Sequence, residues 1–260
     1  MADPMYQFEV KPVVQIAPVD VPGLGLVDLS ITNSTVAMFV AATIIILFFS
    51  VVTASPKVVP GRLQVVGEGM FSFIDDLATG IIGSQGRAFF PFVFTLFIFL
   101  LAMNMLGMFT VFTATAQLAV ALTFAMMSFL LVVVVGLVRN GLGFFKLFLP
   151  SGVPWYLWWL VVPIEVISFL LRPVTLSLRL FGNMLGGHVA MKVFAGFIVS
   201  LSAVASAGGV AYLAYAAAVL AFGGVLALTA LEFLVAFLQA FVFAVLTCVY
   251  LNDAVHAGDH

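Results

Sequence analysis

Long, uninterrupted apolar runs are the feature that most constrains how this chain can fold. About 20 apolar residues in a helix cross the hydrocarbon core of a bilayer, and these runs lack the period-2 alternation of β-barrel strands. The chain has 260 residues, of which 64% are hydrophobic and 8% charged. The sequence therefore predicts an all-α integral membrane protein with five transmembrane helices, at about residues 31–52, 89–111, 117–138, 155–206 and 210–251.

A further helix of a different kind is predicted at residues 62–77. Apolar side chains such as Met70 and Ile74 follow helical spacing there, and the acidic residues Glu68 and Asp76 lie between them. This pattern predicts an amphipathic helix at the membrane interface. A simple polar linker is the alternative interpretation.

The basic residues outside the apolar runs indicate how the chain is oriented. If the five segments alternate across the membrane, five cations fall on one side: Lys57, Arg62, Arg87, Arg139 and Lys146. By the positive-inside rule that side is cytoplasmic. We therefore expect an external N-terminal segment, 1–30, followed by a single membrane domain, 31–251, and a cytoplasmic tail, 252–260. The expected location is a bacterial plasma membrane, with the mitochondrial inner membrane as the alternative.

Arg179 stands within an apolar stretch, where a charge is hard to accommodate. A guanidinium keeps its proton at any relevant pH. A cation at the bilayer centre costs roughly 3 kcal/mol on insertion scales and roughly 10 or more in simulations. Glu165, Arg172 and Arg179 are spaced by seven residues, so a helix places them on one face unless Pro173 breaks it. We therefore expect Arg179 to have a function that offsets its cost.

His188 and Glu232 form a second group of titratable residues. His188 follows Arg179 by nine residues, about 180° around a helix, so the two side chains face different surroundings. Glu232 lies in the last apolar run, at a depth from which it can approach His188. Histidine titrates near neutrality, so this pair could relay protons from outside. Gln239 lies about 10 Å further along the face of Glu232.

A purely structural interpretation of the charged residues is also open. Buried ion pairs can fix the register of packed helices, and they would join Arg179 to Glu232 and Arg172 to Glu165. We favour such a structural role for Arg172 and Lys192. For Arg179, His188 and Glu232 we favour a functional role, because one proton pathway would account for all three positions.

Four short motifs gather in roughly the last hundred residues. They are Ser177-Leu178-Arg179-Leu180-Phe181-Gly182-Asn183-Met184, Gly187-His188, Glu232 with Leu238-Gln239-Ala240-Phe241, and Leu246-Thr247-Cys248-Val249-Tyr250-Leu251. These motifs resemble the signature regions of subunit a of F-type ATP synthases. The resemblance extends to most of the chain in topology. It implies two long, tilted membrane helices that lie against a rotating ring of small, carboxylate-bearing subunits.

The resemblance also implies roles for individual residues. Arg179 resembles the family's essential arginine, which faces the ring. His188 and Glu232 resemble the pair in the outer half-channel, where family members carry glutamate and histidine in either order. Glu165 resembles the acidic residue of the cytoplasmic half-channel. The remaining implied positions are polar residues of the membrane domain: Asn104, Asn183 and Gln239.

The function implied is that of a proton-translocating stator subunit of a rotary ATP synthase, in which Arg179 blocks the proton shortcut between two offset half-channels. The implied partners are the ring, peripheral stalk subunits, the catalytic head and the lipid bilayer, with no nucleic acid. We expect no metal or cofactor, and Cys248 is the single cysteine. Because no phosphate-binding loop appears, ATP chemistry is expected in partner subunits. The alternatives are a proton-coupled secondary transporter and a structural assembly subunit.

Overall fold

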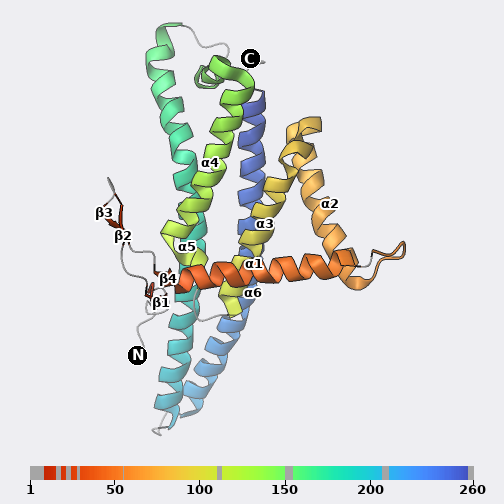
Figure 1. Cartoon of the computed structure of the whole chain (residues 1–260). Helices are drawn as coiled ribbons and strands as arrows, with labels where there is room; N and C mark the ends of the chain where they lie inside the picture. Colours follow the sequence, from red (N-terminus) through yellow and green to blue (C-terminus); the bar gives the residue numbers. More distant parts are fainter. Residues whose placement is uncertain are drawn as a thin grey trace.

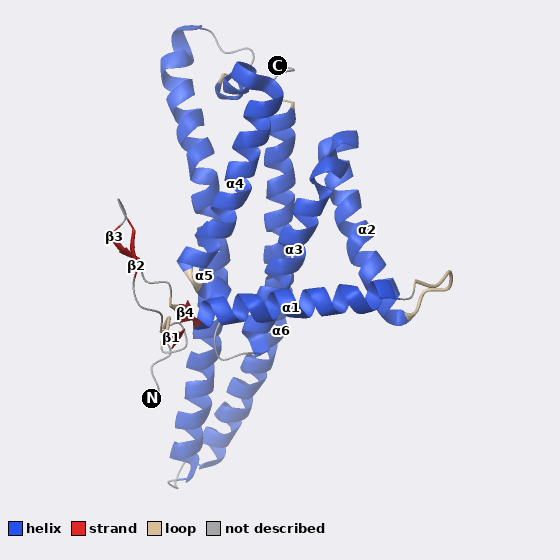
Figure 2. Cartoon of the chain, in the orientation of Figure 1, coloured by secondary structure: helices blue, strands red, loops and turns tan. Residues whose placement is uncertain are grey.

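The computed structural model describes residues 9–15, 19–21, 25–27, 30–54, 56–109, 113–149, 155–206 and 211–256. Helices dominate this part of the chain (Figures 1 and 2). The α-helices are α1 Asn33–Ala54, α2 Arg62–Ile82, α3 Gly86–Phe109, α4 Leu118–Asn140, α5 Trp158–Ser206 and α6 Ala211–Val255. Short 3₁₀ helices accompany them: η2 Gly83–Gln85, η3 Ala114–Ala116, η4 Gly141–Phe148 and η5 Trp155–Leu157.

Five helical segments of the described chain are long and apolar enough to cross a membrane. They are Asn33–Ala54, Arg62–Phe109, Leu118–Asn140, Trp155–Ala203 and Tyr215–Val255. The prediction of an all-α membrane protein with five spanning segments is therefore confirmed. Many large apolar side chains stay exposed on these helices, as on Phe39, Leu130 and Leu226, and such surfaces are suited to contact with lipid.

The second of these segments is a hairpin of α2 and α3. Its 48 residues, Arg62–Phe109, turn back through η2, and the two helices pack side by side (Figure 1). Gly83 has a φ of 78°, which a residue without a Cβ adopts readily. Gly86 then approaches the backbone of α2 so closely that a side chain would clash. The helix expected at 62–77 is thus the first arm of this hairpin and runs to Ile82.

The pattern of burial makes α2 amphipathic. Gly67, Ile74 and Ala78 are buried along one face, and α2 contacts α1, α3 and α6. Glu68 and Asp76 are exposed. The helical spacing that the sequence displayed is therefore used for packing against the bundle. That α2 lies at the membrane interface stays a prediction.

The helices α5 and α6 are much longer than one membrane crossing. They contain 49 and 45 residues, so at about 1.5 Å per residue they extend about 74 and 68 Å, against about 30 Å of hydrocarbon. They pack against each other, and α1 runs across their direction (Figure 1). The helix α5 continues through Pro163 and Pro173. Its charged residues therefore lie on one uninterrupted helix. Helices of this length stay within a bilayer only when they are steeply inclined.

The core lies where α6 meets α2, α3 and α4. Phe97 on α3 and Phe243 on α6 are among its largest fully buried side chains. The buried small residues Ala240, Ala244 and Cys248 repeat every four positions along α6, which allows neighbouring helices to approach closely. This packing fixes the rotation of α6 about its axis, and therefore the direction of its polar side chains.

Both ends of the chain contain structure that the sequence pattern did not predict. Two small antiparallel pairs precede α1: β1 Pro12–Val14 with β4 Ile31–Thr32, and β2 Val19–Val21 with β3 Gly25–Val27. Asn33 anchors the first pair, since its amide group donates to the carbonyl of Glu9 at 2.9 Å and accepts from the amide of Lys11 at 3.2 Å. At the other end α6 continues to Val255, beyond the expected limit at Leu251.

Candidate functional site

Arg179 lies on an exposed face of α5. Leu178, Gly182 and Asn183 are exposed with it, whereas Leu180 is buried against the bundle. Within the described part of the chain, no carboxylate lies within ion-pair distance of the Arg179 guanidinium. The helix thus presents a cation to whatever covers this face.

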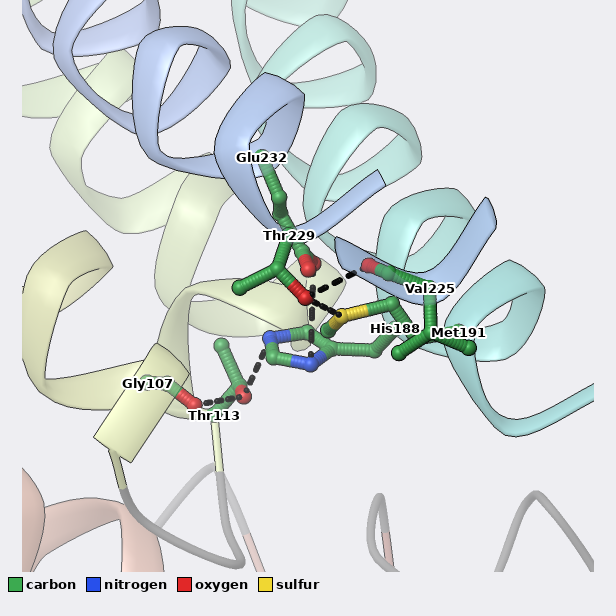
Figure 3. A network of polar contacts seen from close by, with 7 residues as sticks. All are labelled: Gly107, Thr113, His188, Met191, Val225, Thr229 and Glu232. Carbon is green, nitrogen blue, oxygen red and sulfur yellow. Dashed lines mark hydrogen bonds and ion pairs between the residues drawn. The ribbon is translucent and has the colours of Figure 1, made fainter. Parts of the chain in front are cut away.

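His188 and Glu232 face each other inside the bundle (Figure 3). His188 comes from α5 and Glu232 from α6, and Nδ1 of His188 lies 3.6 Å from Oε1 of Glu232. Both side chains are buried. Glu232 therefore pairs with His188, and the ion pair between Glu232 and Arg179 that the structural interpretation required does not form. Arg179 and His188 face different surroundings, as the helical period indicated.

Thr113 completes this network from the connection between α3 and α4. Its Oγ1 lies 2.9 Å from Nε2 of His188 and donates to the carbonyl of Gly107 at 3.2 Å (Figure 3). Thr113 is buried, and the following turn, η3, packs on α5 through Ala116 and Met184. In the sequence Thr113 lies between the helices predicted at 89–111 and 117–138. No signal in the sequence indicated that this connection folds back onto His188.

Gly187 gives Glu232 the space to reach α5. A Cβ at Gly187 would lie 2.6 Å from Oε1 of Glu232, which is closer than non-bonded atoms approach. Neither carboxylate oxygen of Glu232 has a hydrogen-bond partner among the described residues, although both are buried. The missing Cβ of Gly187 therefore allows the carboxylate to lie at this position beside His188.

Replacing Gly187 with alanine is expected to displace the Glu232 carboxylate without unfolding the helix pair, because the clash is with the end of a flexible side chain. We expect proton transport by the assembled complex to fall roughly tenfold, since small displacements of reacting groups have effects of this size. Gly186→Ala is the matched control, because no atom lies within 4 Å of a Cβ built there. Equal effects of the two substitutions would contradict this role of Gly187.

The amide side chains form a second polar group. Asn183 on α5 donates to Oε1 of Gln239 on α6 at 2.9 Å. Asn104 on α3 donates to the carbonyl of Ala236 on α6 at 3.1 Å. Nε2 of Gln239 and Oδ1 of Asn104 are buried without a hydrogen-bond partner among the described residues. The structure thus links the exposed Arg179 face, through Asn183, to a buried polar region on α6.

The remaining charged residues do not form the ion pair that the purely structural interpretation expected. Arg172 pairs with Asp253 at 3.3 Å instead of with Glu165, and its guanidinium lies 4.5 Å from the centre of the Tyr250 ring. Asp253 is part of α6 because this helix does not end at Leu251 but continues to Val255. Glu165 is half-buried on α5. These contacts attach the end of α6 to α5.

Lys192 lies four residues after His188 on α5 and is half-buried. A spacing of four puts two side chains on the same face of a helix. Lys192 is therefore a charged neighbour of the His188 site, on the same side of α5.

Together these features define a class of protein: a multi-pass helical membrane protein with a cation on one face of a long helix and a buried histidine–carboxylate pair on the other. Comparison with known sequences narrows the class. Residues 35–252 match the family described as ATP synthase A chain, and the chain belongs to this family.

Full-length relatives agree with this assignment. The chain is 50% identical over 259 residues to the ATP synthase subunit a of Hyphomonas neptunium, covering 99% of this chain and 98% of that protein. It is 49% identical over 268 residues to that of Maricaulis maris, covering 99% and 100%. It is 48% identical over 257 residues to that of Mesorhizobium japonicum, covering 98% and 96%. With its five apolar segments, the chain is a multi-pass bacterial membrane protein.

Proposed function

We propose that this chain is the proton-translocating stator subunit of a rotary ATP synthase in a bacterial plasma membrane. One observation carries the proposal. Within nine residues, α5 presents Arg179 on an exposed face and His188 in a buried pair with Glu232. A purely structural set of ion pairs would bury and pair the arginine. An exposed intramembrane arginine is instead suited to a partner that brings its own carboxylate.

Arg179 prevents protons from crossing directly between the two access paths. A neutral carboxylic acid enters lipid far more readily than a carboxylate does, so a ring carboxylate must be protonated to rotate through the bilayer. Opposite Arg179 the ionised form is favoured, and the carboxyl group releases its proton. The arginine itself never carries the proton, because its guanidinium stays charged.

His188 and Glu232 deliver protons from the outer side. A proton binds at their contact and passes to a ring carboxylate near the Asn183–Gln239 hydrogen bond. After rotation the proton leaves past Glu165 on the cytoplasmic side. Asn104 holds α3 to α6 beside this path, while Arg172 and Lys192 play supporting structural and electrostatic parts.

The partners follow from this mechanism. A ring of small carboxylate-bearing subunits covers the Arg179 face, a peripheral stalk prevents this chain from turning with the ring, and a catalytic head carries the ATP chemistry. This chain is itself not catalytic and holds no cofactor. Its N-terminus lies outside and its C-terminus in the cytoplasm, with α2 near the cytoplasmic interface, as the distribution of basic residues favours.

The function can be tested by removing this chain from the complex. Inverted vesicles with all other subunits are expected to hydrolyse ATP but not to acidify, and restoring the chain should restore acidification. The purified chain alone in liposomes should move neither protons nor solutes when a proton gradient is imposed. Gradient-driven solute uptake by the chain alone would support a secondary transporter and contradict the proposal.

A further inference from the structure

The hydroxyl of Thr113 contacts two groups, and their chemistry determines where it donates and where it accepts a hydrogen bond. The Gly107 carbonyl can only accept, so the 3.2 Å contact is a hydrogen bond only when the single hydroxyl proton of Thr113 is directed to this carbonyl. The lone pairs of Oγ1 then face Nε2 of His188, 2.9 Å away. This contact is a hydrogen bond only if Nε2 carries a proton. The network thus selects the Nε2–H form of the imidazole.

The selected form leaves Nδ1 to face Glu232. A neutral imidazole with its proton on Nε2 has a lone pair on Nδ1. This lone pair lies 3.6 Å from Oε1 of Glu232, so no proton of either group stands between them when the carboxylate is ionised. The contact becomes attractive when one proton is added, either on Glu232 or on Nδ1. The pair is thereby arranged to bind one proton at a defined place.

We propose that Thr113 is a positioning residue for proton transfer, which holds His188 as the Nε2–H form and makes Nδ1 the atom that exchanges a proton with Glu232. The transfer breaks the O–H bond of a protonated Glu232 and forms N–H at Nδ1, giving imidazolium and carboxylate; the reverse step returns the proton. This inference rests on the proposed function of the His188–Glu232 pair.

Loss of the Thr113 hydroxyl would release the ring of His188 from this constraint. The alternative form, with the proton on Nδ1, would place a donor rather than an acceptor against Glu232. The imidazole could then no longer accept from a protonated Glu232. The hydroxyl contacts drawn in Figure 3 are to Gly107 and His188, so the effect of Thr113 on Glu232 passes through the imidazole ring.

Three substitutions test the inference in the whole ATP synthase. Thr113→Val removes the hydroxyl and keeps the shape, and Thr113→Ser keeps the hydroxyl. Thr115→Val is the matched control, because Thr115 is fully buried in the same connection but its Oγ1 has no hydrogen-bond partner among the described residues. We expect ATP-driven acidification to fall roughly fivefold in Thr113→Val, the size expected for one lost hydrogen bond. Thr113→Ser and Thr115→Val should stay near wild type.

Near-wild-type pumping by Thr113→Val would overturn the inference, as would equal losses in Thr113→Val and Thr115→Val or a failure of Thr113→Ser to pump. A second measurement does not depend on transport. The ¹⁵N spectrum of labelled histidine in the reconstituted complex, with His188 assigned by loss of its signal in His188→Gln, should show the Nε2–H form in wild type and lose it only in Thr113→Val. An Nδ1–H signal in wild type would overturn the inference. If His188→Gln itself pumps normally, the proposed function of the pair fails, while this spectrum still decides the role of Thr113.

Discussion

Replacing Arg179 with alanine in the assembled ATP synthase is expected to reduce ATP-driven acidification of inverted vesicles by about a hundredfold or more. The exposed face of α5 would then carry no charge opposite the ring, because Leu178, Gly182 and Asn183, which are exposed beside Arg179, are uncharged. A ring carboxylate could pass this point still protonated, and protons would cross without driving rotation. Each charge that falls through 100 mV releases about 2.3 kcal/mol, so such a leak removes the coupling directly.

The measurement is the quenching of a pH-sensitive dye, with the subunit content of the vesicles checked for each variant. Leu178→Ala is the matched control, since this side chain is half-exposed on the same face and carries no charge. Arg179→Lys keeps the charge but loses the planar group, and should fall between the two. If the assembled Arg179→Ala complex pumps at the wild-type rate, the arginine is not the barrier between the two paths.

Exchanging the two residues of the buried pair with each other is expected to preserve much of the transport that is lost when one of them is replaced. His188→Ala and Glu232→Ala should each reduce pumping roughly a hundredfold, the lower end of what a positioned proton-transfer group contributes. His188→Glu combined with Glu232→His keeps one imidazole and one carboxylate across the same 3.6 Å contact. The double exchange should therefore retain at least about a tenth of the wild-type rate.

The single exchanges, His188→Glu and Glu232→His, serve as controls for the double exchange. Each puts two groups of the same kind in contact, so two carboxylates or two imidazoles compete for the same proton. Pumping is compared at equal assembly. A double exchange no better than its two single components would show that position, rather than the pairing itself, decides transport.

The class of fold could be predicted because long apolar runs allow few structures. A backbone in hydrocarbon must satisfy its own hydrogen bonds, and an uninterrupted run of this length can do so only as a helix. The relation between Arg179 and His188 on α5 was predictable for a similar reason, since the helical period fixes directions along one helix. The facing of His188 and Glu232 was also expected from their depth, and the structure brings them together.

Contacts that depend on packing between elements were not predictable. Arg172 pairs with Asp253, which was assigned to a tail because hydrophobicity ends before the helix does. Thr113 reaches His188 through a turn whose direction no periodicity encodes. Gly187 is one of 22 glycines, and the close approach of Glu232, which leaves no room for a Cβ, distinguishes it from Gly186. The helical period predicts on which face of its helix a residue lies. It does not predict the contact partner of that residue, which belongs to another element.

The length of α5 changes what the separation between its functional residues means. Glu165 and His188 are 23 residues apart, about 35 Å along the axis. In a helix that stands upright in the membrane, this distance would be a difference in depth. In a steeply inclined helix, most of it lies parallel to the membrane surface. Protons would then arrive and depart at different points on the circumference of the ring. The inclination of α5 would therefore determine the angle through which the rotor turns while a ring carboxylate carries its proton.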